Sequence, residues 1–237
     1  MSSRILPAFL SILVGGGAAF ALDPSKAITQ YVHHVWGFEN GLTQKQIMSI
    51  VQTRDGYLWL ASMQGLVRFD GVTFTQFDTT NTPGLKQTYV WALLEARDGS
   101  LWIGTYGGGL TQLKNGVFTP WGAKQGLSDG MVRTIAESRD GSIWVGTDHG
   151  LNRFQNGKFT VYRTEDGLAS DAIKAIHEDR DGTIWIGTLA GLTRFQDGKF
   201  TTFPVKDGSL TKDLKPVYAI CQTKDGSLWF GQFGGGL

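Results

Sequence analysis

One pattern recurs five times along the 237 residues, at intervals of 41 to 44 residues. In each copy an Asp-Gly pair precedes a Trp, which stands four positions after the Asp. The Asp residues are Asp55, Asp98, Asp140, Asp181 and Asp225, and the Trp residues are Trp59, Trp102, Trp144, Trp185 and Trp229. A period of this length is typical of repeat architectures, in which one small unit buries its apolar faces against copies of itself.

Each repeat divides into four short apolar runs separated by turn residues. The first run ends at the Asp-Gly pair, the second contains the Trp, the third reads Gly-Leu-x-Arg-Phe, and the fourth ends in an aromatic residue. Four such runs predict a four-stranded antiparallel sheet, the blade of a β-propeller. The predicted fold class is therefore all-β. The Asp-Gly pairs predict tight type I′ hairpins between the first two strands of each blade.

The first run of each repeat carries apolar residues eight and five positions before the Asp, which in the third repeat are Val132 and Ile135. In a regular strand, residues three apart point to opposite faces, so both faces of this strand are expected to be buried. That arrangement indicates the innermost strand of a blade, packed between two neighbouring blades.

The repeats place the propeller over residues 22–237, with repeats near 37–77, 78–121, 122–162, 163–203 and 204–237. The fifth repeat is truncated where its third run should begin, so the array is predicted to be incomplete, with about 4.5 blades. An open array leaves strand edges unpaired and an apolar face uncovered, which natural sheets avoid. We therefore expect the natural protein to continue beyond Leu237.

The first residues predict a secretory signal peptide over residues 1–21. Arg4 precedes an apolar run that extends from Ile5 to Phe20, and Ala19-Phe20-Ala21 matches a cleavage site. The run is shorter than the roughly 20 apolar residues that a membrane helix needs, and three glycines interrupt it. The protein is therefore expected to be exported, with membrane attachment only through segments beyond this chain.

The composition argues against two classes of site. The 22 basic and 21 acidic residues nearly balance and form no basic stripe, so nucleic acid is not an expected partner. Cys221 is the single cysteine, which excludes an internal disulfide framework and a cysteine-rich metal site in this sequence. We predict no metal site and no cofactor.

A position filled identically in every repeat is expected to serve the architecture rather than specificity. The five repeated Trp residues are therefore predicted to pack between blades. The five repeated Asp residues are predicted to form turns, because a hairpin offers too few oxygens for the six or more ligands that Ca²⁺ takes.

Specificity for a ligand is expected at positions where the repeats differ from one another, between the residues that every repeat shares. These places are the loops between the second and third runs and the segments that enter the first run, and antiparallel strand order puts both on one face of the propeller. The ligand-binding candidates there are Gln44, Gln64, Tyr106, Asp129, Asp148, His149 and Asp171. Polar groups around the ring of Tyr106 suit a small polar ligand, for example a saccharide. The alternative at these positions is ordinary loop variability.

The repeated Gly-Leu, Asp-Gly-x-Leu-Trp-Ile-Gly-Thr and Gly-Leu-x-Arg-Phe segments resemble the two-component regulator propeller family, from about Gln30 to the end of the chain. Members are extracytoplasmic sensors whose blades precede a small β-sandwich, a membrane helix and a cytoplasmic output module. The resemblance implies a ligand-sensing module at the periplasmic face of the inner membrane, which transmits binding to an output module absent from these residues. It also implies a full-length homodimeric sensor histidine kinase or diguanylate cyclase.

Two other functions stay open on the sequence. One is a secreted propeller enzyme, such as a hydrolase, a lyase or a quinoprotein-like protein, and the other is a scaffold that binds protein partners. The chain contains no Gly-x-Ser-x-Gly elbow, His-Glu-x-x-His motif or phosphate-binding loop. We therefore predict no catalytic residue among these 237.

Overall fold

The computed structural model describes residues 27, 29, 34–44, 46–203 and 216–232. The predicted signal peptide over residues 1–21 lies outside the described residues. The described residues from Gly37 onward belong to one compact unit, which contains all described strands.

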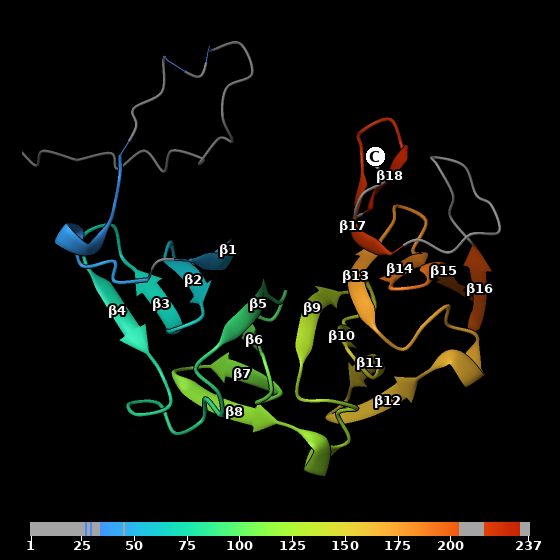
Figure 1. Ribbon diagram of the computed structural model, residues 1–237, viewed down its shortest axis with the longest axis horizontal. Coiled ribbons are helices and arrows are strands. Elements are labelled where there is room, and N and C mark those ends of the chain that lie inside the picture. The colour runs from blue at the N-terminus through green and yellow to red at the C-terminus, as the bar shows by residue number, and fades with distance from the viewer. Residues whose placement is uncertain (1–26, 28, 30–33, 45, 204–215, 233–237) are drawn as a thin grey trace, which may run out of the picture. The chain divides into compact units, whose positions relative to one another are not determined.

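Four sheets each contain four antiparallel strands in chain order (Figure 1). Blade 1 consists of β1 (Ile47–Gln52), β2 (Leu58–Ser62), β3 (Gly65–Phe69) and β4 (Phe74–Phe77), and blade 2 of β5 (Val90–Glu95), β6 (Leu101–Thr105), β7 (Leu110–Lys114) and β8 (Val117–Trp121). Blade 3 consists of β9 (Val132–Glu137), β10 (Ile143–Thr147), β11 (Gly150–Gln155) and β12 (Lys158–Tyr162), and blade 4 of β13 (Ile173–Glu178), β14 (Ile184–Thr188), β15 (Gly191–Gln196) and β16 (Lys199–Phe203).

A fifth sheet, blade 5, pairs β17 (Val217–Gln222) with β18 (Leu228–Gln232). One-turn 3-10 helices are η2 (Phe38–Asn40), η3 (Ala123–Gln125) and η4 (Thr164–Asp166). The predicted all-β fold of four-stranded antiparallel blades is confirmed.

The hydrophobic cores lie between neighbouring blades. The inner strands β1, β5, β9, β13 and β17 pack against one another in chain order. Between blades 3 and 4, Trp144 of β10 packs with Ile173 of β13 and Ile186 of β14. The same register joins blades 1 and 2 through Trp59, and blades 2 and 3 through Trp102. Each blade therefore buries its apolar face only when the next blade stands beside it.

Every inner strand contains a β-bulge near its beginning. In blade 3, Val132 pairs with Thr147 and Thr134 pairs with Gly146, so that Arg133 has no partner across the ladder. The same register shift occurs in the other four inner strands. The bulged residues are Met48, Trp91, Arg133, Lys174 and Tyr218. A bulge inserts one extra residue, bends the strand and redirects a side chain.

The bulge changes which face the apolar residues occupy. Val132 and Ile135 both contribute to the core between blades 2 and 3. The prediction that residues at this spacing face opposite sides is wrong, because the bulged residue between them takes up one position of the alternation. The opposite face is covered by the following residue. In blade 2, Leu93 contributes to the core shared with blade 1, whereas Leu94 contributes to the core shared with blade 3.

The Asp-Gly turns differ from the predicted type I′ hairpin. In the first, the Gly56 N–H donates to the Thr53 carbonyl at 2.8 Å, and the φ of Gly56 is 91° while that of Asp55 is not positive. Type I′ requires positive φ at both central residues, which costs an Asp steric strain that a longer turn with one left-handed glycine avoids. Type I′ geometry occurs instead between the outer strands, where Asn115 and Gly116 have φ of 51° and 77°.

Arginines directly before the Asp-Gly pairs connect the blades. The Arg97 N–H donates to Glu137 Oε2 at 2.8 Å, and Arg97 Nη1 donates to the Arg139 carbonyl at 3.1 Å. Equivalent bonds run from Arg54 to blade 2, from Arg139 to blade 4 and from Arg180 to blade 5. These bonds form a belt that supplements the apolar cores, and its donors stand in one repeated register.

Candidate functional site

The structure brings the loops after the second strands close to the segments that enter the inner strands. The Tyr106 N–H donates to the Tyr89 carbonyl at 2.9 Å, and the Gly107 N–H donates to the Gly130 carbonyl of the next repeat at 2.9 Å. Loop and entering segment thus lie at the same edge of the blades, beside the bulged residues.

Three charged side chains from two blades meet at this edge. Arg133 of β9 donates from Nε and Nη2 to the two carboxylate oxygens of Asp148, at 3.0 and 2.6 Å. Lys174 of β13 donates to Asp148 Oδ1 at 2.7 Å. The side chains of Arg133, Asp148 and Lys174 are 19, 19 and 12% exposed, so this charged cluster is largely shielded but reachable from solvent.

The pairing changes the titration of the cluster. Burial acts to raise the pKa of Asp148, but the hydrogen bonds from Arg133 and Lys174 outweigh it and hold the pKa below its ordinary value. The hydrogen bond to Asp148 raises the pKa of Arg133. Asp148 is therefore a carboxylate at neutral pH, with acceptor oxygens and no proton to give.

An aromatic group adjoins the charged cluster. Tyr89 and Tyr106 stack with their ring centroids 5.2 Å apart, and Trp91 lies 5.7 Å from Tyr89 and 6.3 Å from Tyr106. The guanidinium carbon of Arg133 lies 5.0 Å from the Tyr106 ring centroid and 5.2 Å from that of Trp91. Such cation–π contacts hold the guanidinium in a fixed position beside the rings.

Two further candidates form a pair at the rim. His149 Nδ1 and Asp129 Oδ2 lie 2.6 Å apart, and the His149 side chain is 74% exposed. This hydrogen bond and the Asp129 charge raise the pKa of His149 above its ordinary value of 6.5. Asp171 has a different role, since its carboxylate accepts the Thr164 N–H at 2.7 Å and its carbonyl accepts the Gly150 N–H at 2.8 Å.

Replacing Asp129 by asparagine is expected to lower the pKa of His149 toward about 6.5. The raised folded-state pKa means that the stability which the pair contributes is present below the unfolded pKa and is lost as the pH rises through the folded one. NMR titration of the imidazole measures the shift. Asp197→Asn, in a turn between the outer strands of blade 4, serves as the control and leaves this pKa in place. An unchanged His149 pKa in the Asp129 variant would contradict the pairing.

The two remaining ligand-binding candidates belong to blade 1 and its entering segment. Gln44 is buried, with 8% exposed, whereas Gln64 is exposed and accepts Gln76 Nε2 through its carbonyl at 2.9 Å. No hydrogen bond that the structure gives among the described residues connects either one to the charged cluster. Of the candidates, Asp148 belongs to the charged cluster and Tyr106 to the aromatic group beside it, with Asp129 and His149 at the rim.

The repeated Trp residues differ in burial. Trp59, Trp102 and Trp144 are buried, Trp185 is partly buried, and Trp229 is 47% exposed, with no described sheet following blade 5. The indole N–H groups of Trp59, Trp144 and Trp185 donate to the side chain two positions before the Asp, as Trp144 does to Ser138 Oγ at 3.1 Å.

The repeated Asp carboxylates mostly cap their own turns. Asp140 accepts Ser138 Oγ at 2.6 Å and the Ser142 N–H at 2.9 Å. Burial opposes these bonds, yet the pKa of Asp140 falls to about 2. Asp55, Asp98 and Asp225 accept equivalent bonds. In blade 4 this place is taken by Asp179, which accepts the Thr183 and Asp181 N–H groups.

The family model of the two component regulator propeller matches residues 41–64, 84–107, 126–149, 167–190 and 213–234. The chain belongs to the two-component regulator propeller family. In this family pattern, each of the first four matches begins at a Gly-Leu pair and ends in the loop after the second strand. The family repeat therefore spans the segments in which the charged cluster and its rim lie.

Solved propellers share the fold. The extracellular domain assigned to the hybrid two component system BT4673 from B. thetaiotaomicron aligns with a TM-score of 0.71 and 19% identity, over 89% of this chain and 30% of that one. The corresponding domain of BT3049 gives 0.69 and 22%, over 78% and 26%. Virginiamycin B lyase from Staphylococcus aureus gives 0.65 and 17%, over 81% and 65%.

The chain spans less than a third of the length of these two extracellular domains. At these identities the likeness shows the propeller fold alone. No curated protein matches the chain.

The sequence interpretation missed four residues of this site, namely Tyr89, Trp91, Arg133 and Lys174. A signal for three of them was present in the family repeat. The position seven before the Asp holds a different residue in every copy, namely Met48, Trp91, Arg133, Lys174 and Tyr218. The residue before it is Ile or Val in every copy, and the residue after it is always small. Variability between repeats is expected in loops, whereas this position lies within a predicted strand.

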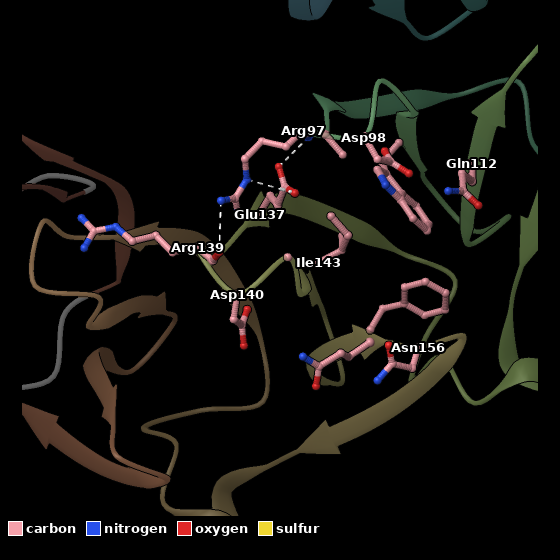
Figure 2. A pocket seen from close by; sticks show the side chains of 13 residues that line it. Arg97, Asp98, Gln112, Glu137, Arg139, Asp140, Ile143 and Asn156 are labelled. Atoms are coloured by element: carbon pink, nitrogen blue, oxygen red, sulfur yellow. Dashed lines mark hydrogen bonds and ion pairs between the residues drawn. The ribbon is translucent and has the colours of Figure 1, made fainter.

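Among the described residues, hollows also lie away from this site, and two of them are between the hairpin turns of neighbouring blades. Figure 2 shows the one between blades 2 and 3, of about 540 Å³, with Arg97, Glu137 and Asp140 around it. A second, of about 470 Å³, is lined by Arg54 and Glu95 between blades 1 and 2. Because an arginine and a glutamate of the belt line each hollow in the same register, both hollows belong to the repeated architecture.

Two features are absent from the described part of the chain. It contains no group of three or more His, Cys, Asp or Glu side chains arranged to hold a metal ion. None of its helices has the length and apolar character needed to cross a membrane.

Proposed function

We propose that this chain is the ligand-sensing propeller module of a bacterial signal-transduction protein, working outside the cytoplasm. The observation that carries the proposal is the charged cluster of Arg133, Asp148 and Lys174 beside the rings of Tyr89, Trp91 and Tyr106. Binding sites combine apolar or aromatic surface with a few converging polar groups, and this edge of the blades offers both.

Membership of the two-component regulator propeller family supports the signalling part of the proposal. The predicted signal peptide and the extracellular domains that share the fold support a location on the periplasmic face of the inner membrane. The full-length protein would then be a homodimer whose cytoplasmic output module is a histidine kinase or a diguanylate cyclase. That part of the proposal rests on family analogy.

The ligand would be a small polar molecule. The cluster offers guanidinium and ammonium donors and carboxylate acceptors within a few ångströms of one another, which suits a ligand rich in hydrogen-bonding groups. Ligand bound here would touch blades 2, 3 and 4 together, because Tyr106, Asp148 and Lys174 come from those blades. Binding would therefore favour one relative arrangement of the three blades, which is a physical route from ligand to output.

A thermal-shift screen tests this proposal. Sugars, amino acids, organic acids and nucleosides are added one by one to the purified chain. At least one class is expected to raise the melting temperature. The Tyr106→Ala variant should lose that shift, whereas Phe38→Ala, which removes an exposed aromatic outside the cluster, should keep it. A screen without any hit, or a hit that Tyr106→Ala retains, would argue against a sensor site here.

A secreted propeller enzyme is the second candidate, and one observation favours it. The His149 and Asp129 pair joins an imidazole to a carboxylate at 2.6 Å, an arrangement that orients a general base. The virginiamycin B lyase with the same fold is an enzyme on this architecture. Mass spectrometry of each screening hit after incubation with the protein distinguishes the two functions, since a sensor returns the ligand unchanged.

A further inference from the structure

The hollow between blades 1 and 2 contains a residue that the other repeats lack, two positions after the Asp. The later repeats all hold a small hydroxyl residue at this position, namely Ser100, Ser142, Thr183 and Ser227. In blade 3, Arg153 of the third strand donates from Nε to Ser142 Oγ at 3.0 Å and from Nη2 to the Asp140 carboxylate. The first repeat holds Tyr57 instead, so the arginine of β3 finds no small hydroxyl residue at this position.

That arginine, Arg68, is held by aromatic rings. Its guanidinium carbon lies 4.5 Å from the Tyr57 ring centroid and 5.9 Å from those of Trp59 and Phe77. Arg68 is partly buried, and among the described residues no carboxylate lies within ion-pair distance of it. Cation–π contacts fix the position of a guanidinium group but do not use its N–H groups as hydrogen-bond donors.

The other charged side chains that line this hollow already have partners. The Arg54 N–H donates to Glu95 Oε1 at 2.9 Å, and the Arg54 guanidinium donates to two backbone carbonyls of blade 2. Asp55 accepts the Thr53 hydroxyl at 2.5 Å within its own turn. Arg68 is thus the cation of this hollow that has no acceptor within the described part of the chain.

The walls around Arg68 are largely apolar. Four aromatic and two aliphatic side chains line the hollow, namely Tyr57, Trp59, Phe77, Phe118, Leu101 and Leu113. Its volume of about 470 Å³ lies within the range of roughly 300 to 1,000 Å³ that small-molecule pockets occupy. One cation without an acceptor, surrounded by aromatic rings, suits a ligand with a single anionic group and a flat apolar body.

We propose that this hollow binds a small aromatic carboxylate, whose oxygens accept hydrogen bonds from Arg68 and whose ring lies against the aromatic walls. A guanidinium group presents parallel N–H groups that match the two oxygens of a carboxylate. The hollow lies at the hairpin turns before the second strands, whereas the charged cluster lies at the loops after them. The two sites are therefore at opposite edges of the blades, and this inference does not depend on the proposed sensor function.

The hollow between blades 2 and 3 provides a comparison within the same chain (Figure 2). Gln112 pairs there with the Trp of its blade, as Arg68 does in blade 1, so the third strand contributes no guanidinium group. Arg97 of that hollow pairs with Glu137 and donates to two backbone carbonyls of blade 3. The glutamine also shows that this register of the blade accommodates an uncharged side chain.

Isothermal titration of the full chain with a defined panel tests the inference. The panel holds benzoate, 4-hydroxybenzoate, cinnamate and indole-3-acetate, the primary amide of each, and acetate and inorganic phosphate. At least one aromatic carboxylate is expected to bind, and its amide should bind about tenfold more weakly because it lacks the charge that Arg68 recognises. Acetate and phosphate should also bind more weakly, since neither has a ring to place against the walls.

Arg68→Gln introduces the residue that blade 2 holds in this register, and it is expected to abolish the preference for the carboxylate over the amide. Arg68→Lys retains the charge without the paired N–H groups, so it should keep that preference at lower affinity. Arg153→Gln, the same change in blade 3, and Tyr106→Ala, at the aromatic group beside the charged cluster, should both bind like the natural chain. Near-UV circular dichroism and thermal unfolding establish that each variant is folded.

The results also separate this inference from the sensor proposal. Amides that bind as tightly as the carboxylates would show that Arg68 does not recognise the ligand, and carboxylate binding that survives Arg68→Gln would place the ligand elsewhere. Acetate or phosphate bound as tightly as the aromatic acids would remove the role of the rings. Failure of every panel member to bind overturns the inference, whereas the sensor proposal is decided by ligands whose binding depends on Tyr106.

Discussion

The Trp144→Ala variant is expected to unfold with a free energy about 3 to 5 kcal/mol below that of the natural chain. Trp144 is 2% exposed and contacts the rings of Tyr162 and Phe195, at centroid distances of 6.0 and 5.3 Å. Its indole N–H donates to Ser138 Oγ at 3.1 Å. Removal of the ring leaves a cavity between blades 3 and 4 and a buried hydroxyl without its donor. Urea denaturation followed by circular dichroism measures the loss.

A matched control exists within the same repeat register. Trp229 stands at the same position of blade 5 but is 47% exposed, so Trp229→Ala should cost about 1 kcal/mol or less. Equal losses in the two variants would mean that the tryptophans act within their own sheets. The conclusion that cores form between blades would then be wrong.

The Gly146→Ala variant is expected to lose about 1 to 3 kcal/mol through overpacking. A Cβ at Gly146 of β10 would lie 2.6 Å from Ile173 Cγ2 and 2.6 Å from Thr134 Cγ2, well inside contact distance. Ile173 is the first residue of the inner strand of blade 4, so the added methyl group pushes two blades apart. The melting temperature and the urea midpoint should both fall.

Gly122→Ala provides the comparison for that variant. The φ of Gly122 is −136°, which any residue adopts, and its added Cβ would meet only Gln125 Oε1, at 3.8 Å. Its stability should remain within about 0.5 kcal/mol of the natural chain. If Gly146→Ala were as stable as Gly122→Ala, the blades would be packed more loosely than the contact between β10 and β13 indicates.

The repeated frame was predictable because its causes are local. A tryptophan between aliphatic residues and a run of alternating apolar and polar residues favour a strand. A glycine that can adopt positive φ favours a turn, and each of these signals spans only a few residues. Five copies of each in constant register then require a structure that stacks copies of itself. The four-stranded blades and the packing of Trp144 between blades follow from this argument.

The candidate site was predictable only in part. Tyr106, Asp148, His149 and Asp129 lie in loops, where variability between repeats draws attention. Arg133 and Lys174 lie within strands, and nothing in their local sequence indicates that one carboxylate binds both. That contact joins residues 15 and 26 positions apart, from two different blades. Short-range sequence patterns do not indicate such a long-range contact.

The bulge separates two kinds of information about the inner strand. The amino-acid pattern gives the spacing of its apolar residues, whereas packing decides the face on which they lie. The constant spacing of three between apolar residues such as Val132 and Ile135 is visible in every repeat, but a regular strand and a bulged strand place them on different faces. Packing selected the bulge, because both side chains must enter the same core between blades 2 and 3. The redirected side chain of Arg133 is the consequence. It pairs with Asp148 of the same blade and lies against the rings of Trp91 and Tyr106 of blade 2.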